Sequence, residues 1–122
     1  MNDAETKDLA YRFYRLLEDP NRRDATLEKL RAASPQLKEE LLDLATKNAD
    51  EAEKEYQARA ATLHSVLFIT ERRKELAEDA QVQEAAKFTE RGFSMASKKL
   101  MIAQDVYMEV SKVYFEGLKL PK

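Results

Sequence analysis

One stretch of the chain decides the fold: residues 35–91 read PQLKEELLDLATKNADEAEKEYQARAATLHSVLFITERRKELAEDAQVQEAAKFTER. After Pro35 this stretch contains neither Gly nor Pro, the residues that most often end a helix. Its apolar side chains recur at intervals of three and four residues, which is typical of one face of an α-helix. They form a slowly drifting stripe: Leu37, Leu41, Leu44, Ala45, Ala52, Tyr56, Ala60, Leu63 and Leu67. The pattern predicts a long helix over residues 35–78, either unbroken or interrupted near residues 48–50.

The chain must reverse its direction after this helix. The best place is Glu78-Asp79-Ala80, where Asp79 is a good N-cap. A second long helix is predicted over residues 80–118, because Gly117 and Pro121 are stop signals. The two helices then form a long antiparallel hairpin. Counting outward from Asp79, we expect residues near Val66 to meet those near Phe93, and residues near Leu44 to meet those near Phe115.

Two short helices are predicted in residues 1–34. Asn2 and Glu5 resemble a capping box at the start of the first helix, which should end by Asp19, before Pro20. Residues 20–23 then form a turn, and Asp24 is the expected N-cap of the second helix. The third helix is expected to begin at Ser34-Pro35, with Ser as its cap and Pro in its first turn.

The composition agrees with an all-α fold. The chain has 122 residues with two Gly and three Pro, which leaves little room for the tight turns of a many-stranded fold. Charged residues make up 36% and apolar residues 43%, which is too apolar for intrinsic disorder. We therefore predict a single domain over residues 1–122. Two hairpins from two chains would complete a coiled-coil-like helical bundle, so a homodimer is expected.

The last helix divides into faces when successive residues are placed 100° apart. We expect its core-facing side to contain Met95, Ala96, Leu100, Ile102, Ala103, Val106, Tyr107, Val110, Val113 and Tyr114. Three further apolar side chains, Met101, Met108 and Phe115, repeat every seven residues between two polar rows. We call these three residues the methionine ridge. Phe68 on the preceding helix lies, in a similar way, opposite its apolar stripe.

The methionine ridge and Phe68 are the predicted partner-binding residues. Large apolar side chains gathered on a surface usually mark an interface, and methionine adapts readily to a partner. Three different partners could pack against the ridge: the two short N-terminal helices of the same chain, a second copy of the chain, or a different protein.

Residues for catalysis or metal binding are scarce in this sequence. There is no Cys and only one histidine, His64, so neither a thiolate metal site nor a typical zinc site is expected. The acidic residues alternate with lysines as on a solvated helix face, and two glycines cannot build a phosphate-binding loop. We expect no enzyme activity, no cofactor and no metal.

A non-enzymatic protein-interaction module is the favoured function: an adaptor, small chaperone or regulator that acts through its apolar C-terminal helix. The alternative is a helical bundle that binds a small ligand among Phe68, Phe88, Phe93, Tyr107 and Tyr114. Nucleic-acid binding is disfavoured because the net charge is −2 and no segment is strongly basic. No membrane association is expected, since the most apolar stretch, residues 60–69, is too short to span a bilayer. A cytoplasmic location follows from these features.

Overall fold

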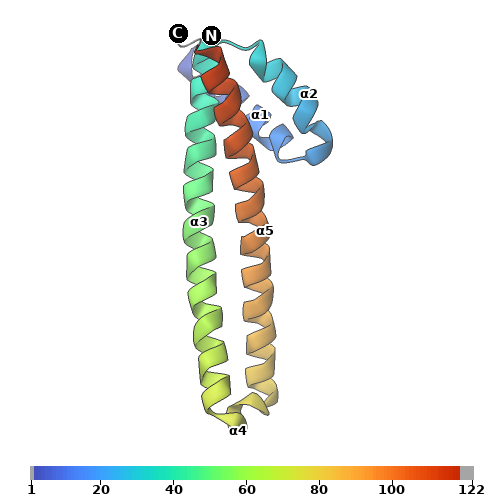
Figure 1. The fold of residues 1–122 in the computed structure, drawn as a ribbon, viewed down its shortest axis with the longest axis vertical. Helices are drawn as coiled ribbons and strands as arrows, with labels where there is room; N and C mark the ends of the chain where they lie inside the picture. The colour runs from blue at the N-terminus through green and yellow to red at the C-terminus, as the bar shows by residue number, and fades with distance from the viewer. Residues whose placement is uncertain (1, 119–122) are drawn as a thin grey trace. The chain divides into compact units, whose positions relative to one another are not determined.

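The computed structural model describes residues 2–118, and within this span it is helical throughout, with short connections and no strand. Its five helices are α1 (Asp3–Leu17), α2 (Pro20–Arg31), α3 (Pro35–Arg72), α4 (Lys74–Ala77) and α5 (Ala80–Gly117) (Figure 1). The predicted all-α fold is confirmed. The stop signal at Pro121 lies outside the described residues.

Helix α1 begins where the capping pair predicts. The Asn2 side chain accepts a hydrogen bond from the Glu5 backbone N–H at 2.8 Å and donates one to the Glu5 carboxylate at 3.3 Å. This arrangement satisfies a backbone N–H that has no partner within the first turn of the helix.

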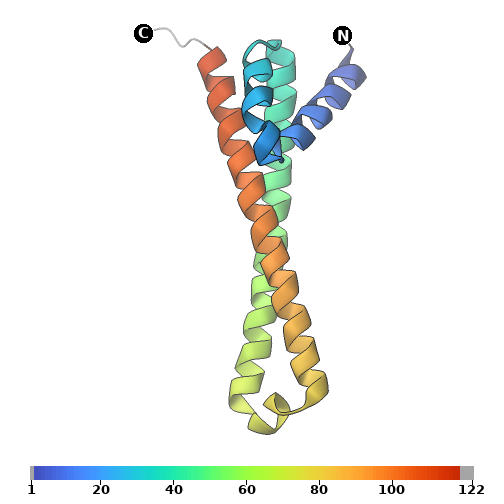
Figure 2. The ribbon, with the colours of Figure 1, turned by 90° about the vertical axis from the view of Figure 1, so that its right-hand side faces the viewer.

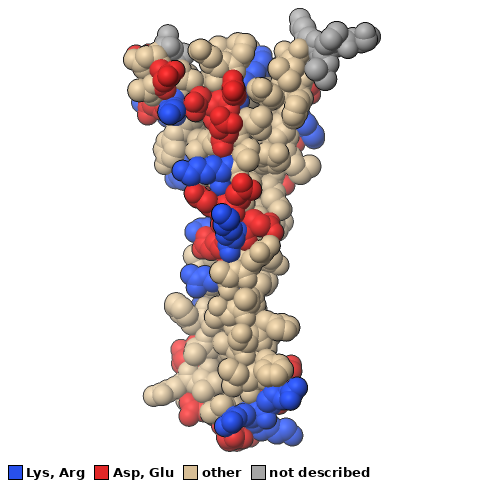
Figure 3. All heavy atoms as spheres, turned by 90° about the vertical axis from the view of Figure 1, so that its left-hand side faces the viewer, with Lys and Arg blue, Asp and Glu red and all other residues tan. Residues whose placement is uncertain are grey.

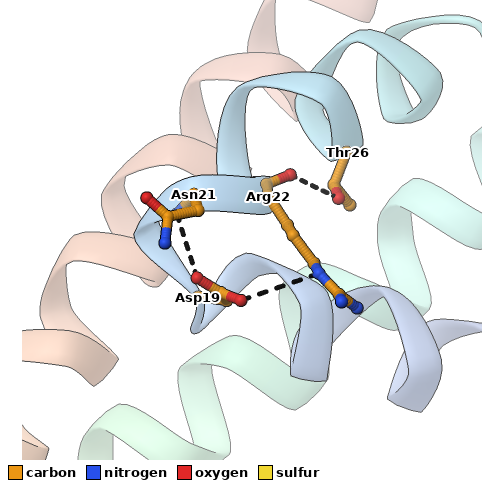
Figure 4. Close-up of polar contacts among 4 residues, drawn as sticks. All are labelled: Asp19, Asn21, Arg22 and Thr26. Carbon is orange, nitrogen blue, oxygen red and sulfur yellow. Dashed lines mark hydrogen bonds and ion pairs between the residues drawn. The ribbon is translucent and has the colours of Figure 1, made fainter.

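Helix α2 begins five residues earlier than we predicted. Asp19, and not Asp24, is its N-cap: the Asp19 carboxylate accepts a hydrogen bond from the Asn21 backbone N–H at 3.0 Å (Figure 4). Arg22 reaches back to the same carboxylate at 3.7 Å. The reason for the difference is Pro20, whose fixed φ suits the first position of a helix as well as it suits a turn.

Helix α3 is continuous through residues 48–50, so the interruption that the sequence allowed there does not occur. It ends at Arg72, earlier than predicted, because Arg73 adopts an extended conformation with φ −125° and ψ 92°. The short helix α4 follows within the connection. Asp79 then caps α5 as predicted, accepting hydrogen bonds from the backbone N–H groups of Gln81 at 2.8 Å and Val82 at 3.2 Å.

The residues group into two compact units. The described parts of Met1–Asp50 and Ile102–Lys122 form unit 1. In this unit α1 and α2 pack against the first part of α3 and the last part of α5 (Figure 2). Its fully buried large side chains are Leu17, Leu30, Leu41, Val106 and Val110. Unit 1 therefore has a conventional hydrophobic core.

Unit 2 is Glu51–Met101, in which α3 and α5 run antiparallel and are joined through α4. The ring centroids of Tyr56 and Phe93 are 5.3 Å apart, and the Lys99 ammonium lies 3.9 Å from the Glu55 carboxylate. Phe93 therefore meets Tyr56 rather than the region of Val66, and our predicted register is wrong. The cause is the early end of α3, which moves the centre of the reversal several residues toward the N-terminus.

Candidate protein-interaction surface

Unit 2 has almost no buried core. Of residues 51–101, Ala96 alone is fully buried. Six large apolar side chains of the same unit are exposed: Leu67, Phe68, Ile69, Phe88, Met95 and Met101. Packing of an apolar face supplies most of the stability of helices in proteins, so a helix pair with this pattern leaves much of its apolar surface without a partner.

Small residues occupy part of the contact between the two helices of unit 2. The half-buried or buried positions of α5 in this unit include Ala86, Gly92 and Ala96, and α3 contributes Ala52 and Ala60. At Gly92 an added Cβ would lie 3.2 Å from the guanidinium of Arg59, whose long side chain reaches over from α3. Larger side chains, including those of Tyr56 and Phe93, also lie in this contact.

The methionine ridge is exposed on α5. The exposed fractions are 62% for Met101, 55% for Met108 and 58% for Phe115. Helices α1 and α2 bury Leu17, Leu27 and Leu30 in the core of unit 1 and leave Met108 and Phe115, the ridge residues of that unit, exposed. Within unit 1, therefore, the two short helices do not cover the ridge.

Phe68 on α3 is also exposed, with 53% of its surface in contact with solvent. The Arg72 guanidinium lies 4.7 Å from the centre of its ring, at a distance typical of a cation–π contact. The structure thus leaves all four predicted partner-binding side chains accessible, on two different helices.

A second exposed apolar row was missed in the sequence analysis. Phe88, Met95 and Ile102 also repeat every seven residues along α5, and Phe88 is the most exposed of the large apolar side chains, at 72%. We expected Met95, Ile102 and Tyr107 to face the core, but all three are exposed. The seven-residue spacing of Phe88, Met95 and Ile102 could have revealed this row in the sequence.

Three of the aromatic residues expected to line a ligand pocket, Phe68, Phe88 and Phe93, lie in unit 2. Phe88 and Phe68 are too exposed to line an enclosed cavity, and the ring of Phe93 packs against Tyr56. The surface of unit 1 has open depressions. One of them is lined mainly by polar groups, including Asp3, Gln36 and Asp43, and another mainly by apolar surface, including that of Ala10, Tyr11 and Leu44.

No cluster of three or more His, Asp or Glu side chains in residues 2–118 has an arrangement that could hold a metal ion. Burial raises the pKa of the Tyr14 phenol, and the nearby Glu18 carboxylate raises it further, against a lowering by a hydrogen bond with Asn48. This tyrosine lies in the core of unit 1, so its altered pKa has a structural cause.

The charges of unit 2 balance. Residues 51–101 contain nine Lys and Arg and nine Asp and Glu. On the side of α3, an uncharged belt crosses the paired helices above the charged side chains at the α4 connection (Figure 3). Within α3 this belt corresponds to residues 60–70, which include no Lys, Arg, Asp or Glu.

Neither long helix has a segment apolar enough, over a sufficient length, to cross a membrane in the part of the chain that the structure describes. When the chain is compared with protein families, curated proteins and solved structures, it matches none of them.

Proposed function

We propose that this chain is a non-enzymatic protein-interaction module that associates with itself through the apolar side chains exposed on α3 and α5. One observation carries the proposal: unit 2 exposes six large apolar side chains and buries a single alanine. Complete burial of a Phe, Leu, Ile or Met side chain contributes roughly 1.5–3 kcal/mol. Covering even part of this surface would therefore stabilise a complex substantially.

A second copy of the chain is the simplest partner. The balanced charges of unit 2 give two copies no net electrostatic repulsion, and closed two-fold dimers are the commonest soluble oligomers. Two hairpins that share their apolar faces would form a four-helix arrangement, in which each helix has the two-sided burial that its sequence requires. An adaptor, a small chaperone or a regulator could each use such a dimer.

The methionine ridge extends the proposed surface along α5. Its side chains are flexible and polarizable, which suits them to a partner whose shape varies. A cytoplasmic location is part of the proposal, and the absence of cysteine is compatible with a reducing compartment.

Light scattering of the wild-type chain tests this proposal directly. We expect a mass approaching twice 14.1 kDa at high protein concentration. The mass should fall toward that of one chain on dilution, over a range of about 1 to 300 μM. A mass of one chain at every concentration, with helix content intact, would contradict self-association.

A further inference from the structure

We infer that two copies of this chain pair through one face of α3, in antiparallel orientation about a two-fold axis near residue 63. This inference rests on the proposed self-association and specifies the part of the contact that α3 makes. The occupant of the face is a second copy of the same chain.

The face consists of six residues, which we call the outer row: Lys54, Ala58, Ala61, Ser65, Phe68 and Arg72. All six are exposed, and they follow one another at intervals of four, three, four, three and four residues. This is the spacing of a helical contact face. The row lies on the side of α3 opposite Leu63, which is half-buried.

The spacing of the outer row is the same when it is read in either direction. Two copies in antiparallel orientation can therefore align every residue of their outer rows. The contact is then isologous, as a two-fold axis requires. In this alignment Phe68 of one copy lies opposite Ala58 of the other, and Ala61 lies opposite Ser65. The large ring then has room above a methyl group, and the two small residues allow the helices to approach closely.

Charges at the two ends of the row favour the same orientation. Residues 51–55 contain three glutamates and one lysine, whereas residues 71–74 contain one glutamate, two arginines and one lysine. In the antiparallel pair, residues 51–55 of one copy lie beside the end of α3 and the start of α4 of the other, where residues 71–74 lie. Lys54 and Arg72, which are both positive, are themselves opposite one another. They are flanked by Glu71 and by Glu55, which also lies 3.9 Å from Lys99 of its own chain.

A parallel pair would be unfavourable both for the charges at the ends of the row and for the sizes of the side chains within it. It would place acidic end beside acidic end and basic end beside basic end, and it would set Phe68 against Phe68 while Ala61 faces Ala61. Exposed ion pairs contribute little affinity, typically about 0.2–1 kcal/mol each. These charges therefore select the orientation, and the uncharged residues between them supply the apolar contact.

Cysteine cross-linking tests the inference without interference, because the natural chain has no cysteine. Lys54→Cys and Arg72→Cys would be prepared as separate chains, one of them carrying an affinity tag, and oxidised either alone or as an equal mixture. In the antiparallel pair, residue 54 of one copy lies opposite residue 72 of the other. Equivalent cysteines are about 18 residues apart along the contact, or roughly 27 Å. A disulfide needs Cα atoms within about 7 Å.

We expect a disulfide dimer between tagged and untagged chains in the mixture, at a yield at least about tenfold that of either chain alone. Ala58→Cys mixed with Phe68→Cys is the second pair and should behave in the same way. Arg12→Cys, on the exposed surface of α1, mixed with Arg72→Cys measures random collision. Circular dichroism of each variant confirms that it has folded.

Three results would overturn the inference. Cross-linking of each variant to itself, without cross-linking in the mixture, indicates parallel pairing. A wild-type dimer by light scattering without any of these cross-links indicates association through another surface, and the proposed function then stands. A wild-type chain that is monomeric at every concentration contradicts both the inference and the proposed self-association.

Discussion

The ring of Tyr56 on α3 lies 5.3 Å from the ring of Phe93 on α5, with the two planes inclined at 38°. Both side chains are half-buried, in a contact that also includes small residues such as Ala52 and Ala60. This pair brings two aromatic rings together in unit 2, whereas Phe68 and Phe88 are exposed. It therefore provides a local measure of how strongly the two helices hold each other.

A double-mutant cycle with Tyr56→Leu and Phe93→Leu should reveal a coupling free energy of about 0.5–1.5 kcal/mol, which is typical of aromatic pairs. Chemical denaturation followed by circular dichroism measures it. The matched control is a cycle of Tyr56→Leu with Phe88→Leu, for which we expect additive effects because Phe88 is exposed. Equal coupling in the two cycles would contradict the observed register.

Replacing the methionine ridge should separate association from folding. In the triple variant Met101→Gln, Met108→Gln and Phe115→Gln, we expect wild-type helix content, because exposed side chains contribute little to the fold. We also expect weaker self-association by light scattering. Tyr11→Gln, at an exposed aromatic residue of α1, is the control and should leave the mass unchanged. Loss of helix content in the triple variant, under conditions in which the wild type is monomeric, would show that the ridge belongs to the core.

Leu41 and Met95 were both expected to face the core, and the structure distinguishes them. Leu41 is fully buried, so Leu41→Ala should lower the free energy of unfolding by about 2–5 kcal/mol. Met95 is exposed, and for the monomer Met95→Ala should change it by less than about 0.5 kcal/mol. Urea denaturation at low protein concentration compares the two variants, and a cost for Met95 similar to that for Leu41 would contradict its exposed position.

Asp79 holds the start of α5 through hydrogen bonds from two backbone N–H groups. Asp79→Ala should lower the free energy of unfolding by about 1 kcal/mol, because these groups lose their acceptor. Asp79→Asn retains a side-chain oxygen and should recover most of this loss. Glu78→Ala, one residue earlier, is the control, and thermal unfolding of all three variants is the measurement.

The raised pKa of Tyr14 predicts that the folded chain loses stability at alkaline pH. Its pKa in the folded chain is raised from the ordinary value of 10.0, mainly by burial. Above about pH 10 the unfolded chain therefore loses the phenolic proton more readily than the folded chain, and the free energy of unfolding falls as the pH rises. Below that pH the phenol is protonated in both states, and the stabilisation from the buried Tyr14 side chain is fully present. Tyr14→Phe should show a smaller decrease than the wild type between about pH 9 and 11, and parallel pH profiles would contradict a buried phenol.

Much of the secondary structure could be read directly from the sequence. The absence of Gly and Pro from residues 36–91 predicted a long helix. The side-chain acceptors of Asn2 and Asp79 predicted where two helices begin. These features act between residues that are close along the chain, so local chemistry is sufficient to determine them. The burial of Ala96, Val106, Val110 and Val113 followed in the same way, because a fixed helical period places them on one side of α5.

The tertiary structure decided what lies opposite each helix face. The register changed because α3 ends at Arg72, and no local pattern distinguished that end from a continuation to residue 78. Met95 and Phe88 are exposed although they are apolar, because a helical period shows which residues share a face but not which face meets the neighbouring helix. The sequence by itself therefore determined the helices and their apolar faces. The packing of α3 against α5 decided which of those faces remain free for a partner.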